Sequence, residues 1–213
     1  MLMLIFYERE KARFMHVDIN VDINIDEVLA FATEKHKGQV RADGSDYITH
    51  PIRVSKLVET YKPSKNADVL KAGALLHDVL EDTYTSYREL VDRFGVVVAS
   101  LVMEVTSSGF MPKLVGKRIY LAHKMHYMSS YALVIKLADR LDNLTDVSAV
   151  SLEKIKRTFF DTIYMINYLE GKRILTDAQK NLISAIRKQL EVINGEYNLT
   201  TNELITNSDL DQD

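Results

Sequence analysis

The sequence predicts an all-α fold, built as one helical bundle of roughly eight to ten helices. Only three prolines and eight glycines interrupt the 213 residues. Most segments between them repeat apolar residues with the period of an amphipathic helix. No linker rich in Pro, Gly or Ser divides the chain. We therefore expect an N-terminal extension over residues 1–24, one domain over residues 25–196 and a flexible acidic tail over residues 197–213.

Local signals place the individual helices. Asn24 and Glu27 resemble a capping pair, Pro51 occupies a favoured first-turn position, and Gly95 ends a helix that Ser86 caps. Residues 37–46 carry two glycines and several polar side chains, and they are predicted to form a loop. The predicted helices cover residues 25–37, 51–62, 67–81, 86–94, 96–105, 112–128, 132–144, 152–170 and 177–194.

Two segments have sequence patterns that would also suit a β-strand. Residues 96–105 are apolar and β-branched, which would suit a strand, but their helical neighbours favour a buried helix. Residues 17–24 alternate apolar with polar side chains, so a short β-extension is an alternative to a loose leader there. Neither alternative changes the predicted class of the domain.

The bulk composition excludes several kinds of protein. The formal net charge of −3 argues against a general nucleic-acid or acidic-membrane binder. The absence of cysteine excludes thiolate zinc sites, disulfides and cysteine nucleophiles, and it suits a reducing cytoplasm. No apolar run reaches the roughly 18 residues that a membrane span needs. We therefore expect a cytoplasmic protein.

The most informative residues are the neighbours His77 and Asp78, which follow the apolar run 72–76. Glu81 lies four residues after His77, and Asp82 lies four residues after Asp78. On one helix, this spacing would place all four groups toward the same side. Four ionisable groups at the edge of a core cost free energy unless they bind something or meet water. A metal ion with a bound water is the simplest explanation.

Two further residues could complete a metal site. His50 precedes Pro51 at the start of a predicted helix, and Asp139 follows the apolar run 134–138 with Asn143 four residues later. Each alone has an ordinary structural reading, as a helix-entry histidine or a buried hydrogen-bonded aspartate. The ordered combination His50, His77-Asp78 and Asp139 favours a metal site. Two imidazoles and two carboxylates suit manganese, iron or zinc better than calcium.

These residues resemble the HD-domain phosphohydrolases, and within them the hydrolase domain of RelA/SpoT-type alarmone enzymes and the small alarmone hydrolases. The chain is too short to hold the synthetase domain of the long enzymes as well, so the resemblance implies a stand-alone hydrolase. The stretches that carry the resemblance are His36-Lys37-Gly38-Gln39-Val40-Arg41, Tyr47-Ile48-Thr49-His50-Pro51, residues 74–83 around His77-Asp78, Glu104-Val105-Thr106 and residues 136–144 around Asp139.

The resemblance implies manganese-dependent removal of the 3′-pyrophosphate from guanosine tetraphosphate or pentaphosphate. It implies that Glu81 and Asp82 orient or deprotonate the attacking water, that Arg41 meets a phosphate and that Asn143 bonds near the ribose. The implied metal ligands are His50, His77, Asp78 and Asp139. Cationic side chains are also needed to neutralise the phosphates, and the candidates are Lys136, Arg140 and Lys156.

Two departures from the family pattern bear on the substrate. Ala42-Asp43 stands where many relatives have a lysine after the arginine, and Ser107-Ser108-Gly109 replaces an acidic and basic pair. Another ribose-phosphate nucleotide, such as NADPH with its 2′-phosphate or a nucleoside monophosphate, is therefore an alternative substrate. A non-catalytic binding module and a nuclease are weaker alternatives. The apolar stripes of the last two helices leave a homodimer open.

Overall fold

The computed structural model describes residues 23–107, 109–147 and 149–199. Regular structure in these residues is helical, apart from one isolated antiparallel bridge between Val40 and Asp46, so the predicted all-α class is confirmed. Residues 96–105 are helical as expected. The alternating segment at residues 17–24 falls outside the described residues, except for its last two positions, which are not in a strand.

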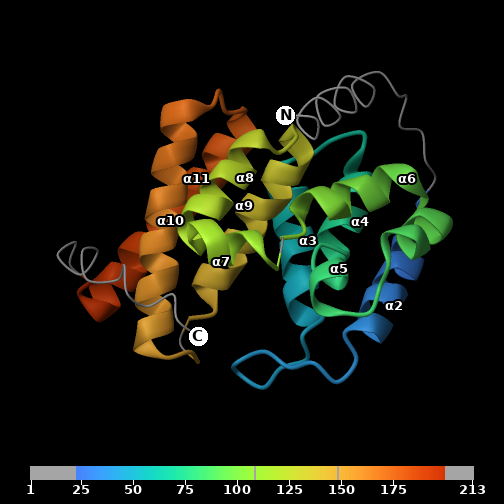
Figure 1. The fold of residues 1–213 in the computed structure, drawn as a ribbon, viewed down its shortest axis with the longest axis horizontal. Helices are drawn as coiled ribbons and strands as arrows, with labels where there is room; N and C mark the ends of the chain where they lie inside the picture. Colours follow the sequence, from blue (N-terminus) through green and yellow to red (C-terminus); the bar gives the residue numbers. More distant parts are fainter. Residues whose placement is uncertain (1–22, 108, 148, 200–213) are drawn as a thin grey trace.

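The helices follow one another along the chain, and the longest connection between them, residues 36–48, joins α2 to α3 (Figure 1). Their bounds are α2 Ile25–Lys35, α3 Thr49–Tyr61, α4 Ala67–Leu75, α5 Val79–Asp82, α6 Tyr87–Val105, α7 Met111–Val115, α8 Lys117–Tyr127, α9 Ser130–Thr145, α10 Leu152–Lys172 and α11 Asp177–Tyr197. In Figure 1, α10 and α11 lie at one end of the molecule, and α2 and α6 lie at the other.

Side-chain caps begin several of these helices where the sequence predicts them. The Asn24 side chain accepts hydrogen bonds from the backbone N–H groups of residues 26 and 27 at the start of α2. The Ser86 hydroxyl accepts one from Glu89 at the start of α6. Such caps satisfy N–H groups that have no partner inside the helix. The predicted stop at Gly95 is a kink inside α6, where φ is 80° and ψ is 161°.

The predicted helix over residues 67–81 is broken at the most informative point of the sequence. Helix α4 ends at Leu75, α5 begins at Val79, and the residues between them form a turn. Neighbouring side chains on a regular helix diverge by about 100° around its axis. In the turn, the His77 Nε2 atom lies 2.9 Å from Asp78 Oδ2. The expectation of a single continuous helix was therefore wrong.

The predicted helix over residues 112–128 is also divided. Gly116, with φ of 82°, separates α7 from α8. A positive φ is readily adopted by glycine, which lacks a Cβ atom. The division lets α8 pack on α10 while α7 extends away from that contact. It also places several apolar side chains of α7 at the surface.

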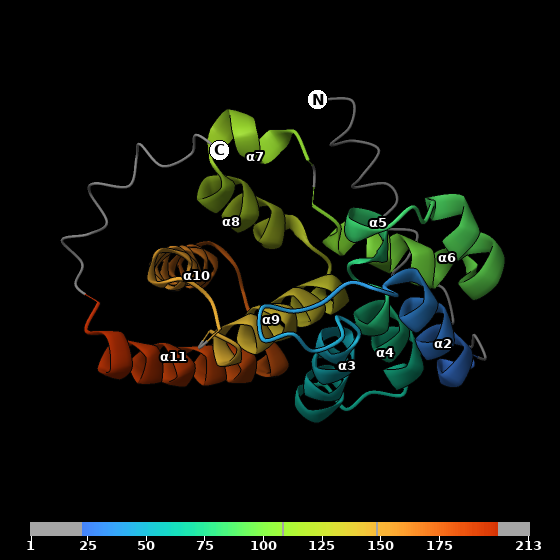
Figure 2. The same ribbon diagram turned by 90° about the horizontal axis from the view of Figure 1, so that it is seen from below.

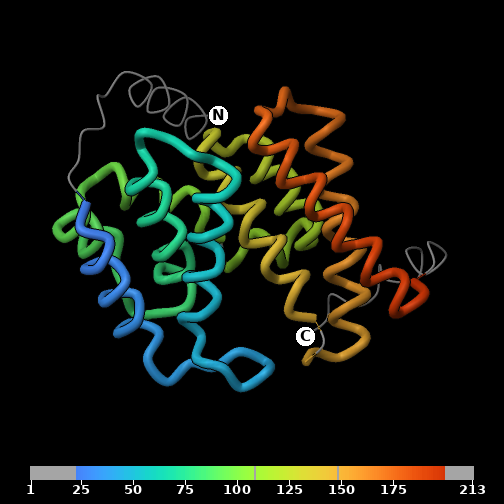
Figure 3. The backbone as a smooth tube through the Cα atoms, turned by 180° about the vertical axis from the view of Figure 1, so that it is seen from behind, coloured from blue at the N-terminus to red at the C-terminus, as the bar shows by residue number. Residues whose placement is uncertain are grey.

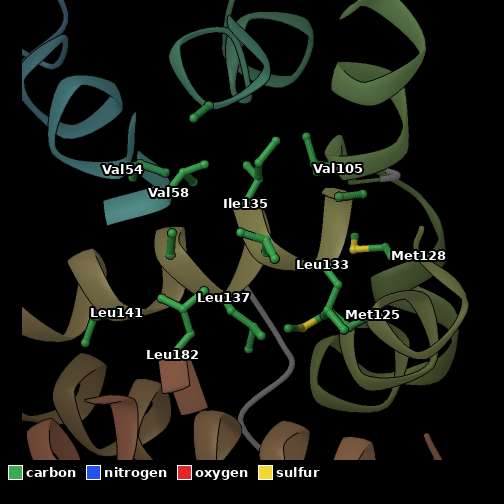
Figure 4. Packing of buried hydrophobic residues seen from close by; sticks show 14 of the residues in the cluster. Val54, Val58, Val105, Met125, Met128, Leu133, Ile135, Leu137, Leu141 and Leu182 are labelled. Atoms are coloured by element: carbon green, nitrogen blue, oxygen red, sulfur yellow. The ribbon is translucent and has the colours of Figure 1, made fainter. Parts of the chain in front are cut away.

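Helix α9 occupies the middle of the bundle. Every residue from 132 to 139 is buried, and the helix contacts α3, α4, α6, α10 and α11. In Figure 2, α10 and α11 lie on one side of α9, with α3 and α4 on the other. Figure 4 shows the apolar residues around it, which include Val54 and Val58 of α3, Leu133, Ile135 and Leu137 of α9, and Leu182 of α11.

The central helix nevertheless carries buried charges. Lys136, Asp139 and Asp142 all belong to α9 and are all buried. A helix that is buried on all sides normally carries apolar residues, and an unpaired charge there would be costly. The backbone trace in Figure 3 shows α9 between α3 and α11, so the partners of these charges must come largely from α9 itself and from the helices beside it.

Within the described residues, none of the helices has the length and apolar character needed to cross a bilayer.

Candidate metal centre

Three of the four predicted ligands meet at one point in the interior. His50 comes from the first turn of α3, His77 from the turn between α4 and α5, and Asp139 from α9. The Nε2 atoms of the two histidines are 3.2 Å apart, and Asp139 Oδ1 lies 3.3 Å from His50 Nε2. One ligand atom from each of the three residues lies within 4.8 Å of the others. All three residues are buried.

Asp78 closes the cluster from the same turn as His77. Its Oδ2 atom lies 2.9 Å from His77 Nε2 and 3.7 Å from His50 Nε2. The Tyr47 hydroxyl donates a hydrogen bond of 2.6 Å to that oxygen, and it is also 3.3 Å from an oxygen of Asp82. Tyr47 thus fixes Asp78 and links it to the carboxylate that follows one turn later.

Both imidazoles are oriented by a partner at the other ring nitrogen. His77 Nδ1 lies 2.7 Å from the Ala74 carbonyl oxygen, and His50 Nδ1 lies 2.6 Å from Asp142 Oδ2. An oxygen acceptor at Nδ1 keeps a proton there and leaves the lone pair on Nε2. Both Nε2 atoms face the carboxylates of the cluster. This donor set of two nitrogens and two carboxylates fits a divalent cation.

The charges in the cluster compensate one another. Burial opposes a charge on His77, but the carboxylates of Asp78 and Asp139 outweigh it and raise its pKa to about 10, so a cation that binds at Nε2 would have to displace a proton. Burial likewise opposes ionisation of Asp139, yet Lys136 and the two histidines hold the pKa of that carboxyl well below its usual value. The carboxylates are therefore ionised at neutral pH, as metal ligands must be.

Asp139 is held by two more residues of its own helix. The Lys136 ammonium lies 2.8 Å from Asp139 Oδ2, and the Asn143 amide donates a bond of 2.6 Å to Oδ1. The oxygen of the same amide accepts a bond of 3.2 Å from Arg41. Lys136 is buried against the carboxylate. Its contact with substrate stays a prediction. Asn143 joins the metal cluster to the loop that carries Arg41.

The two predicted acid/base residues, Glu81 and Asp82, lie in the last turn of α5 and are exposed. Partial desolvation of the carboxyl group, followed by the negative charges of Asp78 and Glu81, nevertheless raises the pKa of Asp82. Glu81 Oε2 accepts a hydrogen bond of 2.9 Å from the backbone N–H of Ser107. The carbonyl of the same peptide group, which belongs to Thr106, accepts a hydrogen bond from the Lys124 ammonium. That peptide therefore connects a cation of α8 with the carboxylate of Glu81.

Cationic side chains lie around this centre. Arg41 reaches Asp146 with Nε at 3.2 Å and Nη2 at 3.1 Å, from a loop that Figure 2 shows passing across α9. Desolvation and then the positive charges of Arg140 and Arg157 lower the pKa of Lys117, and Glu81 acts on it in the opposite direction. Lys117 therefore interacts with both arginines and with Glu81, so cations of α8, α9 and α10 lie on the same side of the site as Glu81. Lys156, also predicted to bind substrate, is half-buried on α10.

Several residues of the site had no assigned role in the sequence. Tyr47 stands three residues before His50, Arg53 stands three residues after it, and Asp142 stands three residues after Asp139. A spacing of three residues places side chains on the same helix face. That spacing could have identified Arg53 and Asp142 as neighbours of the ligands. The position of Lys124 depends on the loop after α6, and no spacing in the sequence indicates it.

Comparison with known proteins places this site in a family. A family model described as HD domain matches residues 28–164, which include all four predicted ligands. The chain belongs to the HD-domain family. This HD domain is similar to a solved structure described as "A metazoan ortholog of SpoT hydrolyzes ppGpp and plays a role in starvation responses". The two have a TM-score of 0.66 and are 30% identical, over 78% of this chain and 94% of the other.

Three curated relatives of this HD domain are named for the same activity. The guanosine-3′,5′-bis(diphosphate) 3′-pyrophosphohydrolase MESH1 of Danio rerio is 40% identical over 60% of this chain and 71% of its own length. The human protein of the same name is 37% identical over 73% of this chain and 90% of its own. A guanosine-3′,5′-bis(diphosphate) 3′-pyrophosphohydrolase of Spiroplasma citri is 36% identical over 61% of this chain, but over only 18% of its own length.

Proposed function

We propose that this HD-domain chain hydrolyses the 3′-pyrophosphate of guanosine tetraphosphate and pentaphosphate, giving GDP or GTP and pyrophosphate, with Mn²⁺ as its metal. The convergence of His50, His77 and Asp139 within 4.8 Å, beside the acidic end of α5, carries the proposal. The names of the similar proteins support the choice of substrate. Cytoplasmic location fits a nucleotide substrate of this kind.

The metal would be held by the Nε2 atoms of His50 and His77 and by carboxylate oxygens of Asp78 and Asp139. A divalent cation there would supply Lewis acidity, lowering the pKa of a water and drawing charge from the phosphate oxygens. Mixed nitrogen and oxygen ligands suit manganese, and they also suit iron and zinc. Lys136 and Asn143 would keep Asp139 in place, since each already bonds to one of its oxygens.

The reaction needs a base for the attacking water. The water oxygen bonds to the phosphorus attached to the ribose 3′-oxygen, the P–O3′ bond breaks, and that oxygen leaves with a proton. The raised pKa of Asp82 makes its carboxylate a better proton acceptor than an ordinary aspartate. Glu81 would orient the water, because the Ser107 N–H holds one of its oxygens and leaves the other available.

The phosphates need positive charge around them. Arg140 and Lys156 are proposed to neutralise the nucleotide phosphates from the side of Glu81, together with Lys117 and Arg157. Arg41 would meet a phosphate through its guanidinium, which lies above the Tyr47 ring with its carbon 5.8 Å from the ring centre. Because Arg41 already pairs with Asp146, a phosphate would have to share or replace that carboxylate.

Product analysis tests the proposal. The purified chain is incubated with guanosine tetraphosphate and Mn²⁺, and GDP and pyrophosphate are measured against a chelator control. We expect equal amounts of the two products and no single phosphate. NADPH and nucleoside monophosphates are assayed in parallel. Release of single phosphate from one of them, with guanosine tetraphosphate left intact, would contradict the proposed substrate while leaving the reaction class in place. Replacing Mn²⁺ by Zn²⁺, Fe²⁺ or Mg²⁺ tests the metal.

A further inference from the structure

A buried carboxylate that is not itself one of the predicted ligands makes the shortest contact to His50. Asp142 lies on α9, only 2% exposed, and its Oδ2 atom is 2.6 Å from His50 Nδ1. Arg53 of α3 binds the same carboxylate with two nitrogens, Nε to Oδ1 at 2.7 Å and Nη2 to Oδ2 at 3.0 Å. Such a two-pronged pair fixes both the position and the plane of the carboxylate.

The contact follows from matched spacings on two packed helices. His50 and Arg53 are three residues apart on α3, and Asp139 and Asp142 are three residues apart on α9. Each pair therefore lies along one face of its helix, and the two helices pack on each other. As a result, one aspartate faces Nε2 of His50 and the other faces Nδ1 of the same ring.

We propose that Asp142, locked by Arg53, is a positioning residue that presents His50 Nε2 to the metal. The carboxylate of Asp142 only accepts hydrogen bonds, so it requires the imidazole proton on Nδ1 and leaves the lone pair on Nε2. It also fixes the ring plane. Partners of this kind behind a ligating histidine strengthen metal binding without touching the ion. The inference rests on the metal site of the proposed function, and not on its substrate.

Arg53 extends the same network to the substrate side. Its Nη2 atom also lies 3.1 Å from Asp146 Oδ2, and Asp146 holds Arg41. The contacts thus run without a gap from His50 through Asp142, Arg53 and Asp146 to Arg41. Loss of Arg53 should therefore affect both metal affinity and the KM for nucleotide, whereas loss of the Asp142 charge should act mainly on metal affinity.

The decisive variant is Asp142→Asn, which keeps the shape and removes one acceptor. An asparagine has one oxygen for three N–H donors, so its NH₂ group must face either Arg53 Nε or the pair formed by Arg53 Nη2 and His50 Nδ1. The dissociation constant for Mn²⁺ is measured by electron paramagnetic resonance of the unbound ion. We expect it to rise roughly 10- to 100-fold. Excess Mn²⁺ should restore most of the turnover, which a general loss of structure would not allow.

A second readout does not depend on activity. In the Zn²⁺-loaded protein, the proton on His50 Nδ1 should give a strongly downfield resonance, and this resonance should be lost in Asp142→Asn. Glu170→Gln is the matched control, because it removes a carboxylate from an ion pair with Arg187 between α10 and α11. It should change neither the Mn²⁺ dissociation constant nor the Nδ1 proton resonance. Circular dichroism and thermal unfolding establish that each variant is folded.

The outcomes separate this inference from the proposed substrate. A folded Asp142→Asn protein with the parental Mn²⁺ affinity and an unchanged Nδ1 proton overturns the role of Asp142. If that variant does not fold, Arg53→Met replaces it. A parental Mn²⁺ affinity in folded Arg53→Met would likewise overturn the role of Asp142. If the parent chain binds Mn²⁺ but leaves guanosine tetraphosphate intact, the substrate assignment fails while the metal measurements still decide this inference.

Discussion

The two sides of the site are built in different ways. On the metal side, formed by α3, the α4–α5 turn and α9, the ligand side chains are buried and held by partners at short distances, such as Ala74 for His77 and Asp142 for His50. On the cationic side, formed by α7, α8, Arg140 of α9 and the start of α10, positive charges repel one another. Apolar side chains there are exposed, with Leu114 61% and Ile119 46% accessible.

This difference indicates which properties are fixed before a substrate binds. A preorganised ligand cluster needs little rearrangement to accept an ion, and that favours a defined reaction class. A group of like charges is stabilised by an anion that binds among them, so its arrangement depends on the ligand. The metal side should therefore determine the type of chemistry, and the cationic side should determine which nucleotide is used. Variants on the two sides should then affect different quantities.

The largest effect is expected from Asp78→Ala on the metal side. It removes the oxygen that lies 2.9 Å from His77 Nε2 and 3.7 Å from His50 Nε2. Because the metal supplies several kcal/mol of transition-state stabilisation, turnover should fall by about a thousandfold or more. Mn²⁺ affinity should fall with it. Calorimetric titration with Mn²⁺ checks the binding, and normal Mn²⁺ affinity in a folded variant would remove Asp78 from the ligand set.

Glu81→Gln should separate catalysis from metal binding. Glu81 lies outside the ligand cluster, and Ser107 holds one of its oxygens, so the amide should keep the local structure but accept no proton. Loss of an acid/base or water-orienting group costs typically 10²- to 10⁴-fold. We expect kcat to fall about a hundredfold with unchanged Mn²⁺ affinity. Steady-state kinetics at saturating Mn²⁺ measure this, and a parental kcat would leave Asp82 as the sole candidate base.

The metal side could be predicted from the sequence to a large extent. Helical periodicity indicated the all-α class, and the order of His50, His77-Asp78 and Asp139 indicated residues that the fold brings together. The periodicity and the His77-Asp78 doublet are local signals, whereas the order of the four predicted ligands was interpreted through the resemblance to the HD-domain phosphohydrolases. The break between α4 and α5 was not predicted. At this break the His77 side chain contacts the Ala74 carbonyl, which a regular helix would have offered to a backbone N–H.

The cationic side could be predicted much less well. Lys136 and Arg140 look equivalent in the sequence, yet Lys136 is buried against Asp139 while Arg140 acts electrostatically on Lys117. The direction of a long side chain depends on which helix packs over it, and spacing alone does not determine that. Asp142 was overlooked for the same reason, since its partners come from α3, 89 and 92 residues away. Spacing along the sequence does not indicate which residues of two different helices will be in contact.

Arg140→Ala tests the cationic side directly. If Arg140 neutralises a substrate phosphate, losing it should raise the KM for guanosine tetraphosphate by about tenfold, which corresponds to one charge-assisted hydrogen bond. Mn²⁺ affinity should not change, because Arg140 is not among the groups around the two imidazoles. A larger loss of Mn²⁺ affinity than of nucleotide affinity would contradict the division of roles between the two sides.

The smallest effect is expected from Lys124→Met, at the boundary between the two sides. Lys124 binds the carbonyl of the peptide whose N–H holds Glu81, so its loss should loosen Glu81 and lower kcat by about threefold. Burial, followed by the charge of Lys136, lowers the pKa of Lys124 from 10.5 to about 8. The ammonium form is therefore lost as the pH rises through about 8, and kcat of the parent chain should decline over that interval.

The pH profile distinguishes this role from a purely structural one. Lys124→Met lacks the titrating group, so its kcat should already be low at pH 7 and should show no decline near pH 8. Lys180→Met, on the exposed surface of α11, should keep the parental profile. If Lys124→Met retained the decline near pH 8, the titrating group would lie elsewhere. The orientation of Glu81 would then depend on the Ser107 N–H without help from α8, and the two sides of the site would be less connected than the contacts suggest.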